Sequence, residues 1–187
     1  MLHVYGGVLK PGNDRRWRIE HAQIVNKNDF DLFGKYRILP SVQPTHATSD
    51  MYWAKERVGE ARLKGGYAYK QLLNENGVLP MGSDFPVESI NPLYGFYAAT
   101  ARQDSVGYPA GGFQMENALT RQEALKGMTI WAAFANFEEK EKGSIEPGKL
   151  ADFVMLDRDI MKVPLREARD AKVVQNSMDM ASAPKQK

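Results

Sequence analysis

The sequence predicts an α/β fold built on a parallel sheet. Two short apolar runs, at 38–44 and 78–81, and an alternating segment at 16–21 have the pattern of strands, and segments with helical spacing lie between and after them. Strands that alternate with helices are joined by right-handed crossovers, so the strands are expected to be parallel. From 16 to 136 the expected order is strand, helix, strand, loop, helix, strand, helix, helix.

Each predicted strand ends in polar residues. The first ends at Glu20 and His21, the second at Gln43, and the third leads into Ser83 and Asp84. Pro86 then stops the third strand, because proline cannot donate to the ladder. Since ligands bind beyond the carboxyl ends of parallel strands, these side chains are expected to share one rim, and Asp84 is the first candidate for chemistry.

The helices are predicted from apolar spacing and from their end signals. An apolar segment at 2–10 is the tail of one helix, and Asn28 or Asp29 caps a second. A helix at 61–76 ends before Gly77, and Asn91-Pro92 opens the next. The stretch 45–50 is expected to be a loop, since it is too polar for a core.

The last predicted helix of this region begins with a capping box and spans 121–136. Thr120 and Glu123 are placed to satisfy free backbone N–H groups of its first turn. Its buried stripe is expected to be Leu125, Met128, Ala132 and Ala135.

The last third of the chain has a different character. The turn region 143–149 precedes an apolar strand at 151–157, which has no crossover helix of the same kind after it and is assigned to a separate sheet. Residues 175–187 are polar and are expected to form a disordered tail.

Composition limits the classes of function. The 187 residues suffice for one domain with a hydrophobic core, and 25 basic against 23 acidic residues give a net charge of +2. This balance predicts neither a nucleic-acid nor a membrane partner. A run of 18 apolar residues and a signal peptide are both absent from the sequence, which predicts a cytoplasmic protein. Since cysteine is absent, only histidine and carboxylates remain as strong metal ligands.

The three strand ends suggest a metal site. His21 and Asp84 can share Zn²⁺ or another divalent metal, because imidazole nitrogen and carboxylate oxygen are both good ligands. Two ligands are fewer than the three of a catalytic zinc site. Plainer interpretations stay open: His21 as a hydrogen-bonded strand end, Ser83 or Asp84 as the cap of a turn, His46 as an exposed loop residue.

Four motifs occur in order and together resemble a known family. They are Arg18-Ile-Glu-His-Ala-Gln23, Ser41-Val-Gln-Pro-Thr-His-Ala47, Gly82-Ser-Asp-Phe-Pro-Val87 and Gly143-Ser-Ile-Glu-Pro-Gly-Lys-Leu-Ala-Asp-Phe153. Across residues 5–174 the chain is similar to the C-terminal part of metal-dependent amidohydrolases of the amidohydrolase 3 family, which includes N-substituted formamide deformylases.

The resemblance implies a partial (β/α)₈ TIM barrel, with about its last three strand-helix units in residues 1–142. Residues 143–174 would return to a small β-sandwich. His21 would bind the metal, and Asp84 would contact the metal and move the proton of the attacking water. Glu20, Gln43, His46 and Ser83 would contact the substrate or support the ligands. The implied reaction is hydrolysis of amide-type, non-peptide C–N bonds in small molecules.

The chain also departs from the family pattern. The His-x-His pair after the first barrel strand, the bridging acidic or modified lysine ligand and the histidine after the fifth strand have no counterpart in it. We therefore expect a fragment that is inactive alone and that needs the N-terminal half or self-association. The alternatives are a non-catalytic, self-associating α/β module with a relic site, and a lactonase or phosphoesterase on the same barrel.

Overall fold

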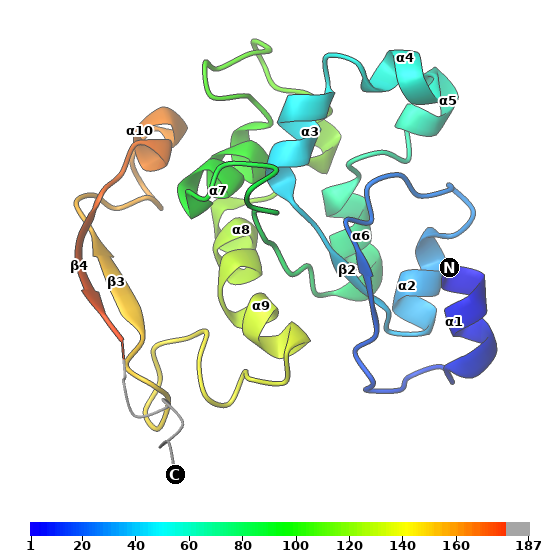
Figure 1. The fold of residues 1–187 in the computed structure, drawn as a ribbon, viewed down its shortest axis with the longest axis horizontal. Coiled ribbons are helices and arrows are strands. Elements are labelled where there is room, and N and C mark those ends of the chain that lie inside the picture. The colour runs from blue at the N-terminus through cyan, green and yellow to red at the C-terminus, as the bar shows by residue number, and fades with distance from the viewer. Residues whose placement is uncertain (179–187) are drawn as a thin grey trace.

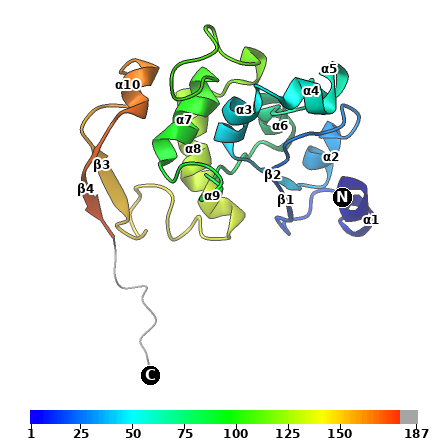
Figure 2. The same cartoon turned by 45° about the horizontal axis from the view of Figure 1, so that its top comes forward.

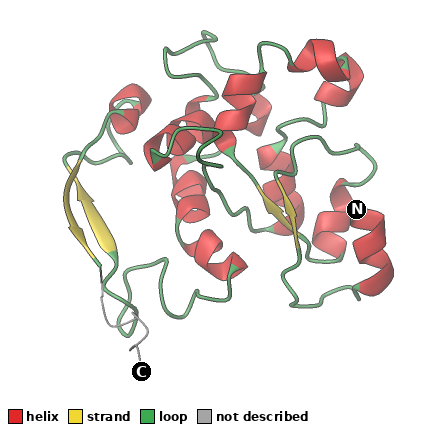
Figure 3. Cartoon of the chain, in the orientation of Figure 1, coloured by secondary structure: helices red, strands yellow, loops and turns green. Residues whose placement is uncertain are grey.

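Short helices and two small sheets make up the residues that the computed structural model describes, 1–178 (Figures 1 and 3). The helices are α1 Leu2–Val8, α2 Phe30–Lys35, α3 Pro44–Asp50, α4 Ala54–Val58, α5 Glu60–Leu63, α6 Tyr69–Asn76, α7 Pro92–Ala101, α8 Arg121–Met128, α9 Ile130–Ala135 and α10 Leu165–Arg169, with a 3₁₀ turn at Met115–Asn117. The strands are β1 Arg18–Glu20, β2 Leu39–Ser41, β3 Phe153–Leu156 and β4 Val173–Ser177.

The first three predicted strands run in parallel. β1 pairs with β2, with Ile19 opposite Pro40, and Val42 forms a further parallel bridge to Met81. The third segment is limited to this bridge, because the Met81 amide donates to the Gly127 carbonyl at 3.0 Å and Pro80 has no amide to donate. All three segments therefore direct their carboxyl ends toward one side of the molecule.

The hydrophobic core supports these strands from one side. Helices α2 and α6 pack on each other, and α6 also contacts β2. The largest apolar side chains of this region have no exposed surface: Phe33, Ile38, Val42, Leu72, Leu79 and Phe96. Because each such side chain contributes about 1.5–3 kcal/mol on burial, the cluster holds the strand ends in a fixed position.

Helix α7 forms as its end signals predict. The Asn91 side chain accepts a hydrogen bond from the Leu93 amide at 3.0 Å, and Pro92 occupies the first turn. The helix packs against α3, α8 and α10, so it is buried on several sides and not only on the predicted face. It is the element that joins the sheet region to the C-terminal part.

The prediction of a loop at 45–50 is wrong, because Pro44–Asp50 is helix α3. Its polar side chains bond to the helix itself: the Thr48 hydroxyl donates to the Thr45 carbonyl at 3.0 Å, and Ser49 reaches the His46 carbonyl at 3.4 Å. Pro44 sits in the first turn, where its fixed φ favours a helix. His46 and Ala47 are consequently buried rather than exposed.

The helix predicted at 61–76 is interrupted. α5 ends at Leu63 and α6 begins at Tyr69, because the chain between them runs beside residues 23–25. The Val25 amide donates to the Gly65 carbonyl at 2.8 Å, and a Cβ at Gly65 would lie 2.0 Å from the Val25 carbonyl oxygen. Only glycine permits this close approach. The predicted end is confirmed, since Gly77 closes α6 with φ of 81°.

The helix predicted at 121–136 is also divided, at Thr129, into α8 and α9. Its capping box is confirmed in both directions between Thr120 and Glu123. The predicted stripe is confirmed in part: Ala135 is buried, and Leu125 and Met128 are half-buried and pack against the core, while Ala132 is half-buried as well. The fully buried residues of the two helices are Ala124, Gly127, Ala133 and Ala135. The face of α8 that lies against Met81 has no room for large side chains. A Cβ at Gly127 would already lie 2.5 Å from the Met81 sulfur.

The C-terminal hairpin stands apart from the parallel sheet, as predicted for 151–157. β3 and β4 pair antiparallel with each other, and Figure 2 shows them at the end of the molecule opposite α1. Val154, Met155, Val173 and Val174 are each more than half exposed. β4 extends through Ser177 and so includes the first residues of the predicted tail, whereas 179–187 lie outside the described residues.

Across residues 1–178, no helix is long and apolar enough to cross a membrane.

Candidate metal centre

The carboxyl ends of the parallel segments bring two histidines and one aspartate together. His21 follows β1, His46 lies in the first turn of α3 after β2, and Asp84 follows the Met81 bridge. One potential ligand atom of each lies within 4.8 Å of those of the other two. Within residues 1–178, these three side chains form a cluster that is close enough to hold one metal ion.

The backbone at this rim is unusual. His21, Ala22 and Asp84 have φ of 67°, 41° and 62°, the left-handed region that non-glycine residues rarely adopt. Such conformations cost about 1–3 kcal/mol each and are common at functional sites, where the surrounding structure holds them. His21 and Asp84, two of the three grouped residues, therefore project from backbone in this unfavourable conformation.

His46 has a buried ring nitrogen with no hydrogen-bond partner. The residue is 8% exposed, and its Nε2 atom lies 3.4 Å from the Asp84 Oδ2 atom without forming a hydrogen bond. The rings of His21 and His46 are stacked, with centroids 5.5 Å apart. A buried polar atom of this kind is costly unless something binds it, so His46 Nε2 is suited to hold a cation.

The donor set fits a divalent metal. Two imidazoles and a carboxylate are the ligand types of catalytic zinc sites, which use three protein ligands and keep one position open. Ligands about 2.0–2.1 Å from a tetrahedral ion lie roughly 3.4 Å apart, which is the distance between His46 Nε2 and Asp84 Oδ2. The structure thus provides the third donor that sequence reasoning lacked.

The other predicted site residues lie beside this group. Glu20 accepts hydrogen bonds from Ser41 at 2.6 Å and from the Gln43 amide at 2.9 Å, and Gln43 Oε1 lies 2.9 Å from His21 Nδ1. Ser83 is different, because its hydroxyl accepts from the Phe85 amide at 3.2 Å and so caps the turn. For Ser83 the plainer interpretation fits its contacts.

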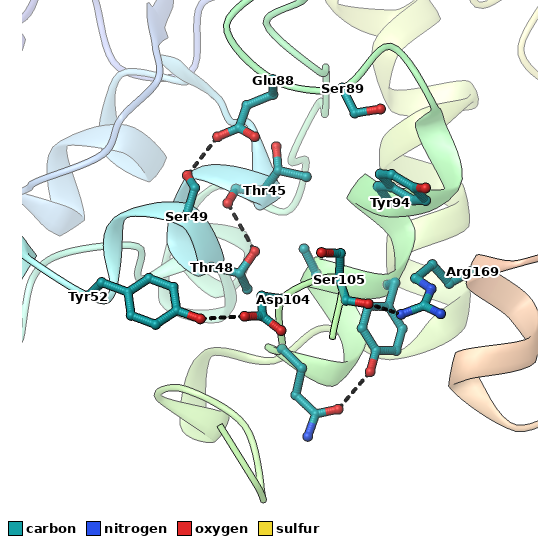
Figure 4. A pocket seen from close by; sticks show the side chains of 13 residues that line it. Thr45, Thr48, Ser49, Tyr52, Glu88, Ser89, Tyr94, Asp104, Ser105 and Arg169 are labelled. Atoms are coloured by element: carbon teal, nitrogen blue, oxygen red, sulfur yellow. Dashed lines mark hydrogen bonds between the residues drawn. The ribbon is translucent and has the colours of Figure 1, made fainter. Parts of the chain in front are cut away.

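A cleft of about 390 Å³ lies along α3, which also carries His46 (Figure 4). The residues lining it come from α3, the segment after Asp84, α7, the loop at 103–105 and α10: Thr45, Thr48, Ser49, Tyr52, Glu88, Ser89, Tyr94, Tyr97, Ala98, Gln103, Asp104, Ser105 and Arg169. Its volume suits a small organic molecule. The loop predicted at 45–50 gives no indication of this cleft, because the cleft lies along the helix that forms there instead.

Polar side chains meet in pairs across the cleft, as the dashed lines in Figure 4 show. Ser49 donates to Glu88 at 2.6 Å, and Tyr52 donates to Asp104. The bond to Asp104 raises the pKa of Tyr52 to about 12, because it stabilises the protonated phenol. The Thr45 hydroxyl is buried without a partner, next to His46 in the chain.

Comparisons with known proteins agree with these observations. The model of the Amidohydrolase family matches residues 8–176. The chain is 40% identical over 163 residues to Protein LONG AFTER FAR-RED 3 of Arabidopsis thaliana, covering 83% of this chain and 27% of that protein. It is 31% identical over 184 residues to N-substituted formamide deformylase of Arthrobacter pascens, covering 96% of this chain and 33% of that protein. The chain therefore spans about a third or less of the length of these relatives.

A solved structure has a similar fold. An uncharacterized metal-dependent hydrolase of Pyrococcus horikoshii superposes with a TM-score of 0.74 at 30% identity, over 88% of this chain and 32% of that one. Its fold is of mixed α/β type, in agreement with the predicted fold class. Since the family model covers most of the residues and includes the His21, His46 and Asp84 positions, the chain belongs to the amidohydrolase family.

Proposed function

We propose that this chain supplies part of the active site of a metal-dependent hydrolase that cleaves amide-type, non-peptide C–N bonds in small molecules. The observation that carries the proposal is the grouping of His21, His46 and Asp84 within 4.8 Å at the ends of three parallel segments. The name of the Arthrobacter pascens relative, a formamide deformylase, supports the choice of a C–N bond.

His21, His46 and Asp84 would hold zinc or another divalent metal. When bound, such an ion supplies Lewis-acid chemistry and activates a water molecule for attack. His46 would bind through its unpartnered Nε2 atom. The nearby cleft along α3 would hold the remainder of the substrate, with Thr45 and Ser49 on the same helix as His46.

Asp84 would act as the base. One of its oxygens lies beside His46, and its side chain is 34% exposed, so the carboxylate can reach both the metal and solvent. A carboxylate in that position can accept the proton of the attacking water and deliver it to the departing amine.

The larger architecture is part of the same proposal. The three parallel segments and their helices would be the last strand-helix units of a (β/α)₈ barrel, and the β3–β4 hairpin would belong to a small β-sandwich. The exposed apolar side chains of that hairpin support this view, as does the edge of β1 that no strand within residues 1–178 pairs with, because exposed sheet edges and apolar faces are usually covered. The partner would be an N-terminal half with the remaining ligands, or a second copy.

A non-catalytic, self-associating module is the second candidate. The same exposed hairpin favours it, since Val154 and Val174 could pack against a second copy of the chain. In that case the three donors would be a relic.

Metal content and mass test the two candidates together. After dialysis against Zn²⁺ and then against metal-free buffer, elemental analysis of the wild type should give close to one ion per chain. His46→Ala and Asp84→Asn should each lose most of it. His3→Ala is the matched control, because His3 is an exposed histidine paired with Asp29.

Light scattering on the same samples gives the mass of the assembly. A chain that retains zinc would then be screened for hydrolysis of formamides and other amides, alone and with an added N-terminal half. A chain that binds no zinc and forms a defined oligomer would refute the metal site and favour the second candidate.

A further inference from the structure

A chain of hydrogen bonds leads from a carboxylate to the ring of His21. Ser41 Oγ donates to Glu20 Oε1 at 2.6 Å, Gln43 Nε2 donates to the same oxygen at 2.9 Å, and Gln43 Oε1 lies 2.9 Å from His21 Nδ1. Ser41 and Gln43 are 7% and 5% exposed, so water competes little for the middle of the chain.

The chemistry of the end group sets the direction of these bonds. An ionised carboxylate only accepts, so the amide nitrogen of Gln43 must face Glu20 and its carbonyl oxygen must face His21. That oxygen also only accepts, and His21 Nδ1 must therefore carry the proton. A neutral imidazole has a single N–H, so the lone pair is left on Nε2.

We infer that Gln43 and Glu20 are positioning residues that hold His21 in the Nδ1–H tautomer, with Nε2 free to bind an ion. The inference rests on the metal site proposed above. In proteins, the second ring nitrogen of a metal-binding histidine is usually fixed in this way, which sets both tautomer and ring orientation. Here the fixing group is an amide whose own orientation is set by Glu20.

Gln43 also connects His21 to His46. Its backbone carbonyl accepts from the His46 amide at 3.0 Å and from the Tyr69 hydroxyl at 3.1 Å. Tyr69 is 1% exposed and belongs to the core, so its hydrogen bond attaches the first turn of α3 to the core. A single residue thus orients one candidate ligand through its side chain and the other through its backbone.

The tautomer of His21 can be measured without any metal. In the metal-free chain labelled with ¹⁵N-histidine, long-range ¹H–¹⁵N correlation spectra distinguish Nδ1–H from Nε2–H imidazole. Spectra would be recorded well above the ordinary histidine pKa of about 6.5. His3→Ala and His46→Ala assign the three histidine signals. The wild type is expected to show His21 as Nδ1–H.

Four variants test the direction of the chain of bonds. Glu20→Gln and Gln43→Met should each move His21 toward the Nε2–H form. The swapped double variant Glu20→Gln/Gln43→Glu should restore Nδ1–H, because the amide introduced at position 20 can donate to the carboxylate introduced at position 43, and that carboxylate can accept from His21. Ser41→Ala is the matched control, since it removes a bond to Glu20 but leaves the link to Gln43.

Affinity for Co²⁺ alone, followed by its visible absorption, is the second readout. The single variants at 20 and 43 should weaken binding by about 10–100-fold and the swapped pair should recover it. An Nε2–H wild type, or single variants with unchanged tautomer, would overturn the inference even if Co²⁺ binds. If the tautomers are as expected but Co²⁺ does not bind, the proposed metal site is refuted. The role of Gln43 and Glu20 in setting the tautomer of His21 would then still stand.

Discussion

The ion pair between Arg16 and Glu139 should make the stability of the chain depend on acid pH. The Arg16 guanidinium donates to both carboxylate oxygens of Glu139, at 2.9 and 2.8 Å, and to the Phe134 carbonyl at 2.6 Å. It also lies over the rings of Phe134 and Phe137, 3.8 and 4.2 Å from their centroids. These contacts tie the segment before β1 to the end of α9, more than a hundred residues away in the sequence.

The hydrogen bonds from Arg16 lower the pKa of Glu139 from 4.5 to about 2. A folded-state pKa below the unfolded value means that the ionised form favours folding. The stabilisation is complete above about pH 4.5 and is lost as the pH falls toward 2. The full shift corresponds to about 3 kcal/mol, but the Glu139 side chain is 26% exposed, and solvent screening reduces the expected contribution to about 1 kcal/mol.

Urea unfolding at several pH values measures this contribution. Glu139→Gln should lower the free energy of unfolding by about 1 kcal/mol at neutral pH and should flatten its dependence on pH between 4.5 and 2. Glu138→Gln is a suitable control, because Glu138 forms a largely solvent-exposed ion pair with Lys142 on the adjacent turn. If Glu139→Gln and wild type lost stability equally over that pH range, Arg16 would not be the cause of the low pKa.

Three further substitutions test the local structure. Gly65→Ala should destabilise the chain by about 2–4 kcal/mol, since its Cβ would clash with the Val25 carbonyl, whereas Gly7→Ala in the open part of α1 should stabilise it by up to about 1 kcal/mol. Equal effects of the two on thermal unfolding would contradict the close approach at Gly65. Thr120→Ala should cost about 1 kcal/mol, because it removes half of the capping box with Glu123; a cost by urea unfolding no larger than that of Gln122→Ala, at an exposed position of the same helix, would refute the cap.

Local signals in the sequence predicted those elements whose ends are determined locally. Asn91-Pro92 and the Thr120 capping box act on backbone groups within four residues, and both form as expected. The same holds for Gly77, which needs only its own left-handed φ. The predictions were wrong where a contact with a residue distant in the sequence determines the structure. The contact with Val25 interrupts the helix before Tyr69, and the close approach of Met81 requires a glycine at position 127 of α8.

The site was predictable to a similar degree. The polar strand ends indicated His21 and Asp84 as neighbours, because parallel strands bring their carboxyl ends together. The sequence places His46 in a loop, since the periodicity of the seven mostly polar residues of α3 does not indicate a buried helix. Giving weight to Pro44 as a helix start could have placed His46 one turn from the rim. The route from Glu20 through Gln43 to His21 needs side-chain positions and has no sequence signal.

The left-handed backbone at His21 and Asp84 restricts what evolution or mutagenesis can place there. β-Branched residues such as valine or threonine would be rejected for steric reasons alone, before any question of chemistry arises. Asparagine and glycine tolerate this conformation, so they remove a donor with little damage to the main chain. In a saturation library, the ranking of substitutions at 21 and 84 would thus combine backbone tolerance with any loss of metal binding, whereas the ranking at His46 would carry no left-handed backbone requirement. Comparing the rankings separates what the backbone requires from what the proposed metal site requires.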